Sequence, residues 1–324
     1  MKGVLGIGNA ITDILAVVPD DTILNDLHYK KGSMQLVDYD TIEKIKNKIN
    51  SFIHSTKSGG SVGNTIYGVA SLNFPAAFIG KIGNDSIGNF YKKDMEEQGV
   101  DCFFSYSSKN SGLAIAIITP DSERTFATYL GAASELTPDN IIVEIFDKYQ
   151  ILHLEGYLVF NQELLLYVAQ KAKEKNLKIS FDLSSFNIVE ENREFIKNFL
   201  CKYVDIVFAN EEEARAFCGL DAFEAVKELN KCSQLAIVKM GNKGSVVKKN
   251  GDIHHIPAIN ANVVDTTGAG DWYAAGFLYG LCNNLDLIKS AQIATFLAGK
   301  VIEHIGAKIP QIVLPEIVRL AKKL

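Results

Sequence analysis

The chain has 324 residues, of which 47% are hydrophobic and 22% charged, and its formal net charge is −5. This composition is typical of a globular protein with room for one large α/β domain and an appendage. No apolar run approaches the roughly eighteen residues of a membrane span, and no block of Lys and Arg favours nucleic acid. The scattered cysteines contain no C-x-x-C pair, so we expect neither a zinc site nor a disulfide framework, and a reducing cytoplasm fits the chain.

Short β-rich apolar runs alternate with amphipathic helical stretches, which is typical of parallel strands joined by helical crossovers. The expected core strands are 4–8, 77–80, 151–154, 179–182, 206–209 and 236–240. The expected helices are 40–53, 64–72, 87–98, 162–175 and 222–229. The pattern therefore predicts an α/β fold with a mostly parallel central sheet.

Two stretches interrupt this alternation. Residues 13–38 and 102–130 read as strands without intervening helices, with a hairpin near residues 119–122. Because core sequence separates them, they would have to meet in space as a small sheet, which we interpret as a lid. We expect lid and core to form one folding unit over 1–324. The core would then comprise 1–12, 39–101 and 131–324.

The strongest chemical signal is the run Gly268-Ala269-Gly270-Asp271, which precedes an apolar helical stretch. Small residues at a helix start let several backbone N–H groups converge on an anion at the positive end of the helix dipole. An acid directly after such a cradle would repel a phosphate that is merely bound, but it could accept a proton from a hydroxyl attacking a phosphoryl group. The alternative is a glycine-rich turn in which Asp271 only caps the helix.

A second signal, Asn210 and Glu213, follows the predicted strand 206–209. Ligands of open α/β sheets collect outside the carboxyl ends of the strands, and an amide with a carboxylate there could hold hydrated Mg²⁺. The alternative is an acidic first turn that complements the helix dipole.

A third signal is the pair Gly59 and Gly60, followed by Asn64. The glycines would let a polar substrate approach the backbone, and the Asn64 amide could bind it, although a plain helix-entry loop would look similar. Asp13 follows the first strand, and its carboxylate could accept hydrogen bonds from two neighbouring sugar hydroxyls. A lone aspartate in this position is more often a turn residue.

Two common nucleotide-binding patterns are missing from the sequence. It has no Walker G-x-x-x-x-G-K-[ST] run, which excludes a P-loop kinase. Gly6-Ile7-Gly8 is followed by Ile11 where a dinucleotide fingerprint needs Gly or Ala, which argues against a Rossmann oxidoreductase.

Taken together, these motifs closely resemble the ribokinase-like family, also called the PfkB carbohydrate and nucleoside kinases. The resemblance spans the whole chain and is strongest at 59–64, 80–88, 239–244 and 265–271, and at Asn210 and Glu213. Within the family, the segments that resemble the bacterial adenosine kinases are 8–13, 31–34, 122–126, 129–132 and 155–158. The resemblance implies a three-layer α/β/α core with a small β-sheet lid.

It also implies a role for individual residues. Asp271 would be the catalytic base, the amides of Gly268, Ala269 and Gly270 would hold the transferring phosphoryl group, and Arg124 would reach towards that group from the lid hinge. The residues implied for the sugar of the substrate are Asp13, Gly59, Gly60 and Asn64. The residues implied to enclose its base are Met34, Leu36, Phe126 and Tyr157.

The cofactors implied by the resemblance are ATP and Mg²⁺. Asn210 and Glu213 would act on Mg²⁺ largely through water, and the hairpin with Lys239, Gly241 and Gly244 would line the ATP site. Many members of the family also bind a monovalent cation such as K⁺. The matching positions here are Asp265, Thr267 and Gly306, but the segment 306–310 is one residue shorter than in ribokinase, which puts K⁺ dependence in doubt.

The resulting functional hypothesis is a cytoplasmic, ATP-dependent kinase for the 5′ hydroxyl of a nucleoside, converting adenosine to AMP in purine salvage. The protein would act as a monomer or homodimer, with no nucleic acid or membrane partner. One alternative is a kinase for ribose, fructose or a related furanose. Another is a sensing module that kept the fold and lost catalysis, although binding alone does not require a base such as Asp271.

Overall fold

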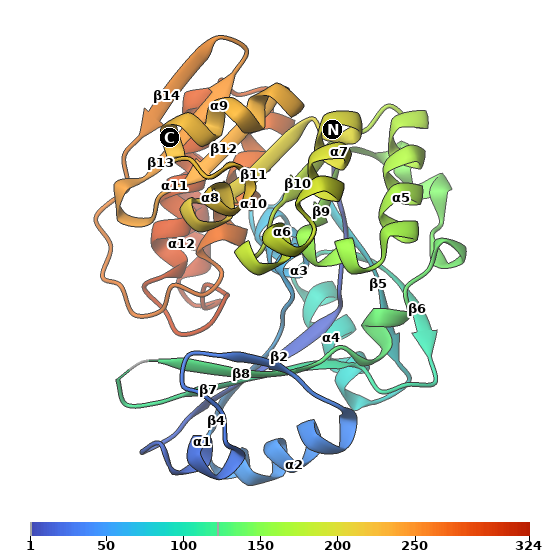
Figure 1. Ribbon diagram of the computed structural model, residues 1–324, viewed down its shortest axis with the longest axis vertical. Coiled ribbons are helices and arrows are strands. Elements are labelled where there is room, and N and C mark those ends of the chain that lie inside the picture. Colours follow the sequence, from blue (N-terminus) through green and yellow to red (C-terminus); the bar gives the residue numbers. More distant parts are fainter. Residues whose placement is uncertain (1, 122) are drawn as a thin grey trace.

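The computed structural model describes residues 2–121 and 123–324. The chain forms two sheets of different size, one of nine strands and one of five. Figure 1 shows the smaller sheet, with its own two helices, projecting from one end of the layered body that contains the larger sheet. The expected three-layer α/β fold with a small second sheet is confirmed.

The large sheet is parallel except for the hairpin at one edge, where β13 and β14 run antiparallel to their neighbours. From that edge to the other its strands are β14 (Asp252–Ile256), β13 (Ser245–Lys249), β12 (Leu235–Lys239), β11 (Ile206–Asn210), β10 (Lys178–Asp182), β9 (Tyr149–Glu155), β1 (Gly3–Ile7), β5 (Ala76–Gly83) and β6 (Asp101–Ser107). The order of the strands along the chain reverses between β1 and β9, because β5 and β6 lie on one side of β1 and β9 to β12 on the other. Such a reversal point is where open α/β sheets bind their ligands.

Helices cover both faces of this sheet. One face packs against α3 (Ser61–Ser71), α4 (Ser86–Glu97), α10 (Ala269–Cys282), α11 (Leu287–Val301) and α12 (Leu314–Ala321). The other packs against α5 (Gln162–Glu174), α6 (Phe186–Glu191), α7 (Arg193–Tyr203), α8 (Glu211–Cys218) and α9 (Ala222–Cys232).

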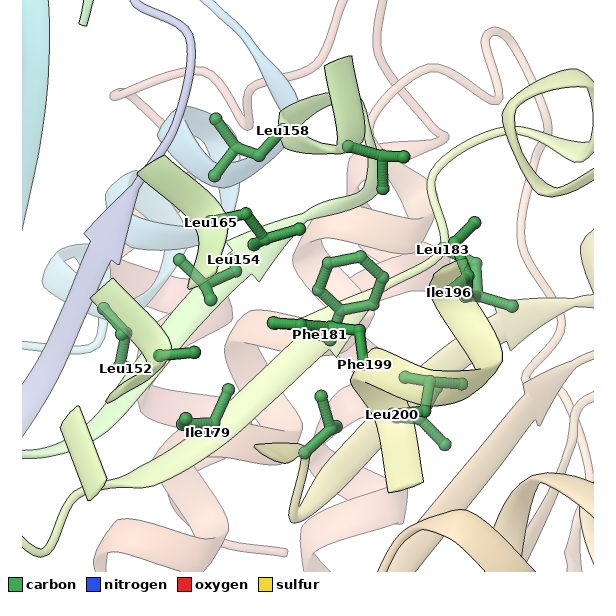
Figure 2. Close-up of a cluster of buried hydrophobic side chains, with 14 of the residues drawn as sticks. Leu152, Leu154, Leu158, Leu165, Ile179, Phe181, Leu183, Ile196, Phe199 and Leu200 are labelled. Atoms are coloured by element: carbon green, nitrogen blue, oxygen red, sulfur yellow. The ribbon is translucent and has the colours of Figure 1, made fainter. Parts of the chain in front are cut away.

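The interior strands are apolar on both sides because both sides are covered. In β11, Ile206 and Phe208 pack on the α10 face, whereas Val207 and Ala209 pack on the α8 and α9 face, and all four are buried. Figure 2 shows the apolar cluster on the α8 and α9 face of the sheet, at the point where β9 and β10 meet α5 and α7. This two-sided burial is why these strands stand out in the sequence as short continuous apolar runs.

The small sheet mixes parallel and antiparallel pairs. In spatial order its strands are β3 (Met34–Leu36), β8 (Arg124–Tyr129), β7 (Gly112–Ile118), β2 (Ile11–Val17) and β4 (Ile53–Ser58). One face is covered by α2 (Tyr39–Ile49), with α1 (Thr22–Leu27) beside it, through an apolar cluster that includes Ile42, Ile45 and Ile115. The opposite face carries Leu15 and Phe126 and turns towards the core.

The small sheet differs from the expected lid in three places. β6 pairs with β5 at the edge of the large sheet, so residues 102–107 are not part of the small sheet. β4 and α2 belong to the small sheet although both were expected in the core. α1 interrupts the stretch 13–38, which was expected to lack helices. β4 was missed because its polar sequence, around His54 and Lys57, is half exposed and shows little apolar alternation.

Other expectations agree with the structure. The predicted core strands and helices all form, within a few residues of the expected bounds. β7 and β8 form the predicted hairpin, in which the Thr119 amide donates to the Glu123 carbonyl at 3.1 Å. Ser122, which belongs both to this turn and to the segment 122–126, lies outside the described residues. Across 2–121 and 123–324, no helix has the length and apolar character needed to span a bilayer.

One expectation about cysteines was wrong. Cys201, near the end of α7, and Cys232, at the end of α9, form a disulfide. The two are 31 positions apart in the sequence, and nothing in that spacing indicates that two helix ends meet. Cys102, Cys218 and Cys282 are free.

Candidate active site

Polar side chains gather at the carboxyl ends of four neighbouring strands of the large sheet. Glu155 ends β9, Asp182 ends β10, Asn210 ends β11 and Lys239 ends β12. Strand ends that are adjacent in a parallel sheet lie at one edge, so these groups share the same end of the molecule. The first turns of α3 and α10 approach the same edge, because Ser61 and Asn64 contact Asp271.

Asp271 lies in the first turn of α10 and is held by α3. Its Oδ1 accepts a hydrogen bond from the Ser61 hydroxyl at 2.9 Å, and its Oδ2 accepts one from the Asn64 amide at 2.9 Å. Burial raises the pKa of the Asp271 carboxyl to about 7, against the lowering effect of these two hydrogen bonds. A fixed carboxylate with a pKa near neutrality is suited to accept a proton at physiological pH.

The loop before α10 requires glycine for steric reasons. Gly268 adopts φ +77°, in the left-handed region, and a Cβ there would lie 2.8 Å from the Cα of Ala307. The Ala269 amide donates to the Thr266 carbonyl at 3.2 Å. Of the three amides expected to form an anion cradle, this one is thus engaged within the loop. The helix N-terminus still presents its positive end beside Asp271.

Asp13, on β2, lies against the glycine-rich loop. A Cβ added to Gly59 would lie 2.1 Å from Oδ2 of Asp13, and Gly60 adopts φ +78° with no room for a side chain beside the Asn9 carbonyl. Burial raises the pKa of Asp13 to about 7, and the positive charge of Lys308 opposes that shift. Among the described residues the Asp13 carboxylate has no hydrogen-bond partner, so both of its oxygens can accept bonds from a ligand.

Glu155 connects the strand end of β9 to both neighbouring segments. Its Oε1 accepts hydrogen bonds from the Asn9 backbone at 3.0 Å and the Asn9 amide at 2.8 Å, while its Oε2 accepts one from the Val62 amide at 3.0 Å. Burial raises the pKa of Glu155 despite these bonds. The carboxylate therefore fixes the start of α3 relative to β1, beneath the loop that carries Gly59 and Gly60.

Asn210 and Glu213 bond to each other. The Asn210 side chain accepts from the Glu213 backbone N–H at 2.8 Å, and Glu213 Oε2 accepts from the Asn210 backbone N–H at 2.8 Å, which is a capping box at the start of α8. Glu213 Oε1 also accepts from the Asn210 side-chain amide at 2.8 Å. Burial and the nearby Asp182 charge raise the pKa of Glu213 to about 7. The sequence left open only that acidic residues here complement the helix dipole, and the structure adds a capping role that was not expected.

Lys239 and Asp182 form a buried ion pair beside the start of α10. The Lys239 Nζ lies 2.7 Å from Asp182 Oδ2, and a Cβ on Gly270 would lie 3.0 Å from the same nitrogen. Burial works against the charge on Lys239, but Asp182 and Glu213 outweigh it and raise the lysine pKa. The lysine thus brings a positive charge to the loop in which Gly270 precedes Asp271.

The expected ATP hairpin is present between β12 and β13. Gly241 and Gly244 have φ +57° and +91°, and a Cβ on Gly244 would lie 2.0 Å from the Ile256 carbonyl oxygen. Gly244 is thus required by the turn itself, whereas a Cβ on Gly241 would meet nothing.

Arg124 links the small sheet to the loop before α10. Its Nη2 lies 2.7 Å from Oδ2 of the fully buried Asp265 carboxylate. The same carboxylate accepts hydrogen bonds from the amides of Thr267 at 2.7 Å and Gly306 at 2.6 Å. In this arrangement the Arg124 side chain is paired with Asp265 of the core, and its expected role towards the transferring phosphoryl group stays a prediction.

The residues expected to bind a monovalent cation do not fit one here. Thr267 and Gly306 turn N–H donors towards Asp265, and the positive charge beside that acid is the guanidinium of Arg124. A cation needs oxygen ligands, so K⁺ would have to displace these contacts.

Of the four residues expected to enclose a base, Met34, Leu36 and Tyr157 are exposed, whereas Phe126 is partly buried against the cluster of Leu15, Ala116 and Ile118. Met34 pairs directly with Phe126 across β3 and β8, so both side chains project from the same face of the small sheet as Leu36. Met34 is 51% exposed, Leu36 63% and Tyr157 36%. An apolar face is present, and it is open to solvent.

Sequence reasoning overlooked four residues of this site: Ser61, Glu155, Asp182 and Lys308. Asp182 could have been found, because it closes the predicted strand 179–182 as Asn210 follows 206–209. Ser61 and Lys308 carry no such signal, since their partners lie far away in the sequence.

The match to known proteins agrees with this geometry. The model of the pfkB family carbohydrate kinases matches residues 33–313. The chain belongs to this family. Kinases of the pfkB family transfer a phosphoryl group to a hydroxyl group of a small molecule, with ATP as the donor.

Similar proteins carry two kinds of name. The chain is 34% identical to the adenosine kinase of Sinorhizobium meliloti, with a TM-score of 0.88 over 99% of each chain. It is 33% identical to a structure described as a probable sugar kinase of Rhizobium etli, with a TM-score of 0.90 over 100% and 99% of the two chains. It is also 27% identical to adenosine kinase 2 of Arabidopsis thaliana, over 95% of each chain.

Proposed function

We propose that this pfkB kinase phosphorylates the 5′ hydroxyl of a nucleoside, with adenosine as its acceptor and AMP as its product. The observation that carries the proposal is that the site contains two carboxylates, Asp271 and Asp13, with different surroundings. Asp271 is held by two donors at a helix N-terminus, whereas Asp13 lies unpaired against Gly59. Asp271 is suited to take the proton of the attacking hydroxyl, and Asp13 is suited to accept hydrogen bonds from two other hydroxyls of the substrate.

In the proposed reaction the 5′ oxygen of the acceptor attacks the terminal phosphorus of ATP, and the bond from that phosphorus to the bridging oxygen of ADP breaks. Asp271 accepts the proton of the attacking hydroxyl, with Ser61 and Asn64 holding its carboxylate in place. Lys239 and the amides at the start of α10 offset the charge on the transferring group. Asp13 accepts hydrogen bonds from the 2′ and 3′ hydroxyls of the ribose.

Mg²⁺ fits the proposed ATP site in its chemistry. Asp182, Asn210 and Glu213 supply oxygen donors at adjoining strand ends, and Mg²⁺ that is bound mainly by phosphates needs few protein ligands. Within the described part of the chain, no cluster of three or more His, Cys, Asp or Glu is arranged as a metal site. When bound, Mg²⁺ would neutralise charge on the phosphates.

The choice of adenosine depends on the apolar side chains of Met34, Leu36 and Phe126 on the small sheet, with Tyr157 of the core as a further candidate to contact the base. A purine buries its rings against such a face, whereas a simple furanose leaves the face in water. The names of the S. meliloti and A. thaliana relatives support adenosine. The R. etli relative and the large exposure of Leu36 favour a second candidate, a furanose kinase.

An assay of ADP formation with adenosine, inosine, ribose and fructose separates the two candidates. We expect adenosine to give the highest kcat/KM by at least about tenfold, the effect of a few buried apolar contacts. A higher kcat/KM for ribose or fructose would contradict the nucleoside proposal and favour the furanose kinase.

A further inference from the structure

A buried lysine outside the reacting groups joins several segments of the site. Lys308 lies in the loop between α11 and α12, and only 7% of its surface is exposed. Its Nζ lies 2.7 Å from Oδ2 of Asp94, contacts the Ser58 hydroxyl, and stands 3.7 Å from the centre of the Tyr67 ring. A buried ammonium group is costly unless it is paired, so these three contacts fix the lysine in one position.

Lys308 thereby holds the loop that lies against Asp13. Ser58 is the last residue of β4 and directly precedes Gly59 and Gly60. Asp94 Oδ2 accepts hydrogen bonds from the Ser58 amide at 2.9 Å and the Ser58 hydroxyl at 2.7 Å. Tyr91, on the same helix α4, donates its hydroxyl to the Gly59 carbonyl at 3.0 Å. Residues 58–59, at the start of the glycine loop, are therefore held in position by α4 and by Lys308.

The two residues before Lys308 hold the other half of the site. The Gly306 amide donates to Asp265 at 2.6 Å, and the Ala307 carbonyl accepts from the Trp272 ring nitrogen at 2.8 Å. Asp265 and Trp272 flank the loop with Gly268, Ala269 and Gly270. Gly306, Ala307 and Lys308 thus contact residues beside both glycine-rich loops, although these two loops lie far apart in the sequence.

We propose that Lys308 is a positioning residue for the transfer reaction. By tying Ser58 and Asp94 to the segment that holds the loop before α10, it sets the distance between the acceptor hydroxyl and the phosphoryl group. The inference rests on the proposed acceptor site at Asp13 and Gly59, and it holds for a nucleoside or a sugar. In-line transfer is sensitive to such placement, because an error of about 1 Å can cost on the order of a hundredfold in rate.

The test is Lys308→Met, which keeps the aliphatic stem and removes the ammonium group. We expect the KM for the acceptor to rise at least about tenfold while the KM for ATP stays within about twofold, because the proposed ATP site lies at the ends of β10, β11 and β12. We also expect more than one ADP per phosphorylated acceptor, since a misplaced acceptor lets water compete. Partial unfolding alone would lower kcat and leave both KM values and this ratio unchanged.

Two further variants keep the test decisive. Ser58→Ala removes the hydroxyl between Lys308 and Asp94 but retains their ion pair, and it should raise the acceptor KM by a smaller factor. Lys300→Met is the matched control, because Lys300 is also paired to an acid at 2.9 Å and lies 6.0 Å from an aromatic ring centre, both within 296–303. Its acceptor KM and ATP KM should both equal those of the wild type.

The role of Lys308 is overturned if the acceptor KM of folded Lys308→Met or Ser58→Ala stays within twofold of wild type. It is equally overturned if the acceptor KM and the ATP KM rise by the same factor. A wild-type enzyme that phosphorylates none of the acceptors contradicts the proposed function instead, so the two failures are distinguishable.

Discussion

Asp271 combines a raised pKa with a fixed position, and each has a separate physical cause. Its withdrawal from water disfavours the charged form, and the donors on α3 hold the two oxygens in place. Among the carboxylates at this edge, Glu155 is saturated by N–H groups and Asp182 is paired with Lys239. Asp271 differs from both, because its hydrogen-bond partners are the neutral side chains of Ser61 and Asn64.

Asp271→Asn should therefore lower kcat by about 10²–10⁴ and change both KM values by no more than a few-fold. The carboxamide keeps the shape of the side chain but cannot accept the proton. Steady-state kinetics with adenosine and ATP would measure this. Near-normal turnover in the variant would remove Asp271 from the reaction.

The wild-type pH profile should carry the same signature. Since the base must be deprotonated and its pKa is about 7, kcat/KM should rise with pH and level off above about pH 7–8. Protonation of Asp13, whose pKa is also about 7, should steepen the loss below pH 6. An acidic limb centred near pH 4 would contradict both assignments.

Asp13 is the residue that distinguishes acceptors by their hydroxyls. Asp13→Ala should cost about 1.5–3 kcal/mol in kcat/KM for each charge-assisted hydrogen bond lost. The wild-type enzyme should discriminate against 2′-deoxyadenosine, and the variant much less, because the group that reads the missing hydroxyl is gone. A variant that retained the full preference for adenosine would show that Asp13 does not contact the ribose.

The start of helix α8 shows how one pair of residues can serve structure and function together. Its capping box satisfies amides of the first turn, yet it also places Glu213 within the electrostatic reach of Asp182 and Lys239. Capping alone would explain the contacts, so a role with Mg²⁺ needs a test that leaves the cap intact.

Glu213→Gln provides that test, because the Gln carbonyl oxygen can still accept the capping hydrogen bond from the Asn210 backbone N–H, and only the second bond, from the Asn210 side-chain amide, is lost. We expect activity at low Mg²⁺ to fall and added Mg²⁺ to restore part of it, with a loss of stability of no more than about 1 kcal/mol. Glu212→Gln is the matched control, since Glu212 occupies the same turn but is exposed. If the Mg²⁺ activation curves of both variants matched the wild type, Glu213 would be a capping residue only.

At the scale of the whole molecule, the buried carboxylates that make the site reactive also lower the stability of the folded protein at neutral pH. Asp13 has a folded-state pKa of about 7 against an unfolded value near 3.8. The stability associated with it is therefore fully present below about pH 4, and it is lost as pH rises through 7, where the folded protein must keep a partly buried charge. The same direction holds for Asp271.

Asp13→Asn should consequently stabilise the free protein at pH 8 by about 1–3 kcal/mol, and by less at pH 5. Thermal unfolding at the two pH values, without ligands, would measure the difference. Asp252→Asn, at an exposed position on β14, should show no such pH-dependent gain. Destabilisation of Asp13→Asn at pH 8 would mean that the carboxylate is stabilised by its surroundings in the free protein.

The sequence by itself determined the layered α/β fold and most of the candidate site. Strands such as β11 are buried on both faces and therefore appear as apolar runs, while the helices between them show the period of a one-sided apolar stripe. The glycine-rich loops before α3 and α10, with Asn64 and Asp271, are local in the sequence because backbone conformation at a helix start is a local property.

Only the tertiary structure decided which distant groups meet. β6 joined the large sheet and β4 the small one because strand pairing depends on partners elsewhere in the chain, which a half-exposed segment does not specify. The disulfide between Cys201 and Cys232, the ion pair of Arg124 with Asp265, and the contact of Lys308 with Ser58 have the same origin. These contacts matter for stability because unpaired polar or charged groups are costly when buried. Burial arises only when distant segments pack together, so no single segment of the sequence shows it.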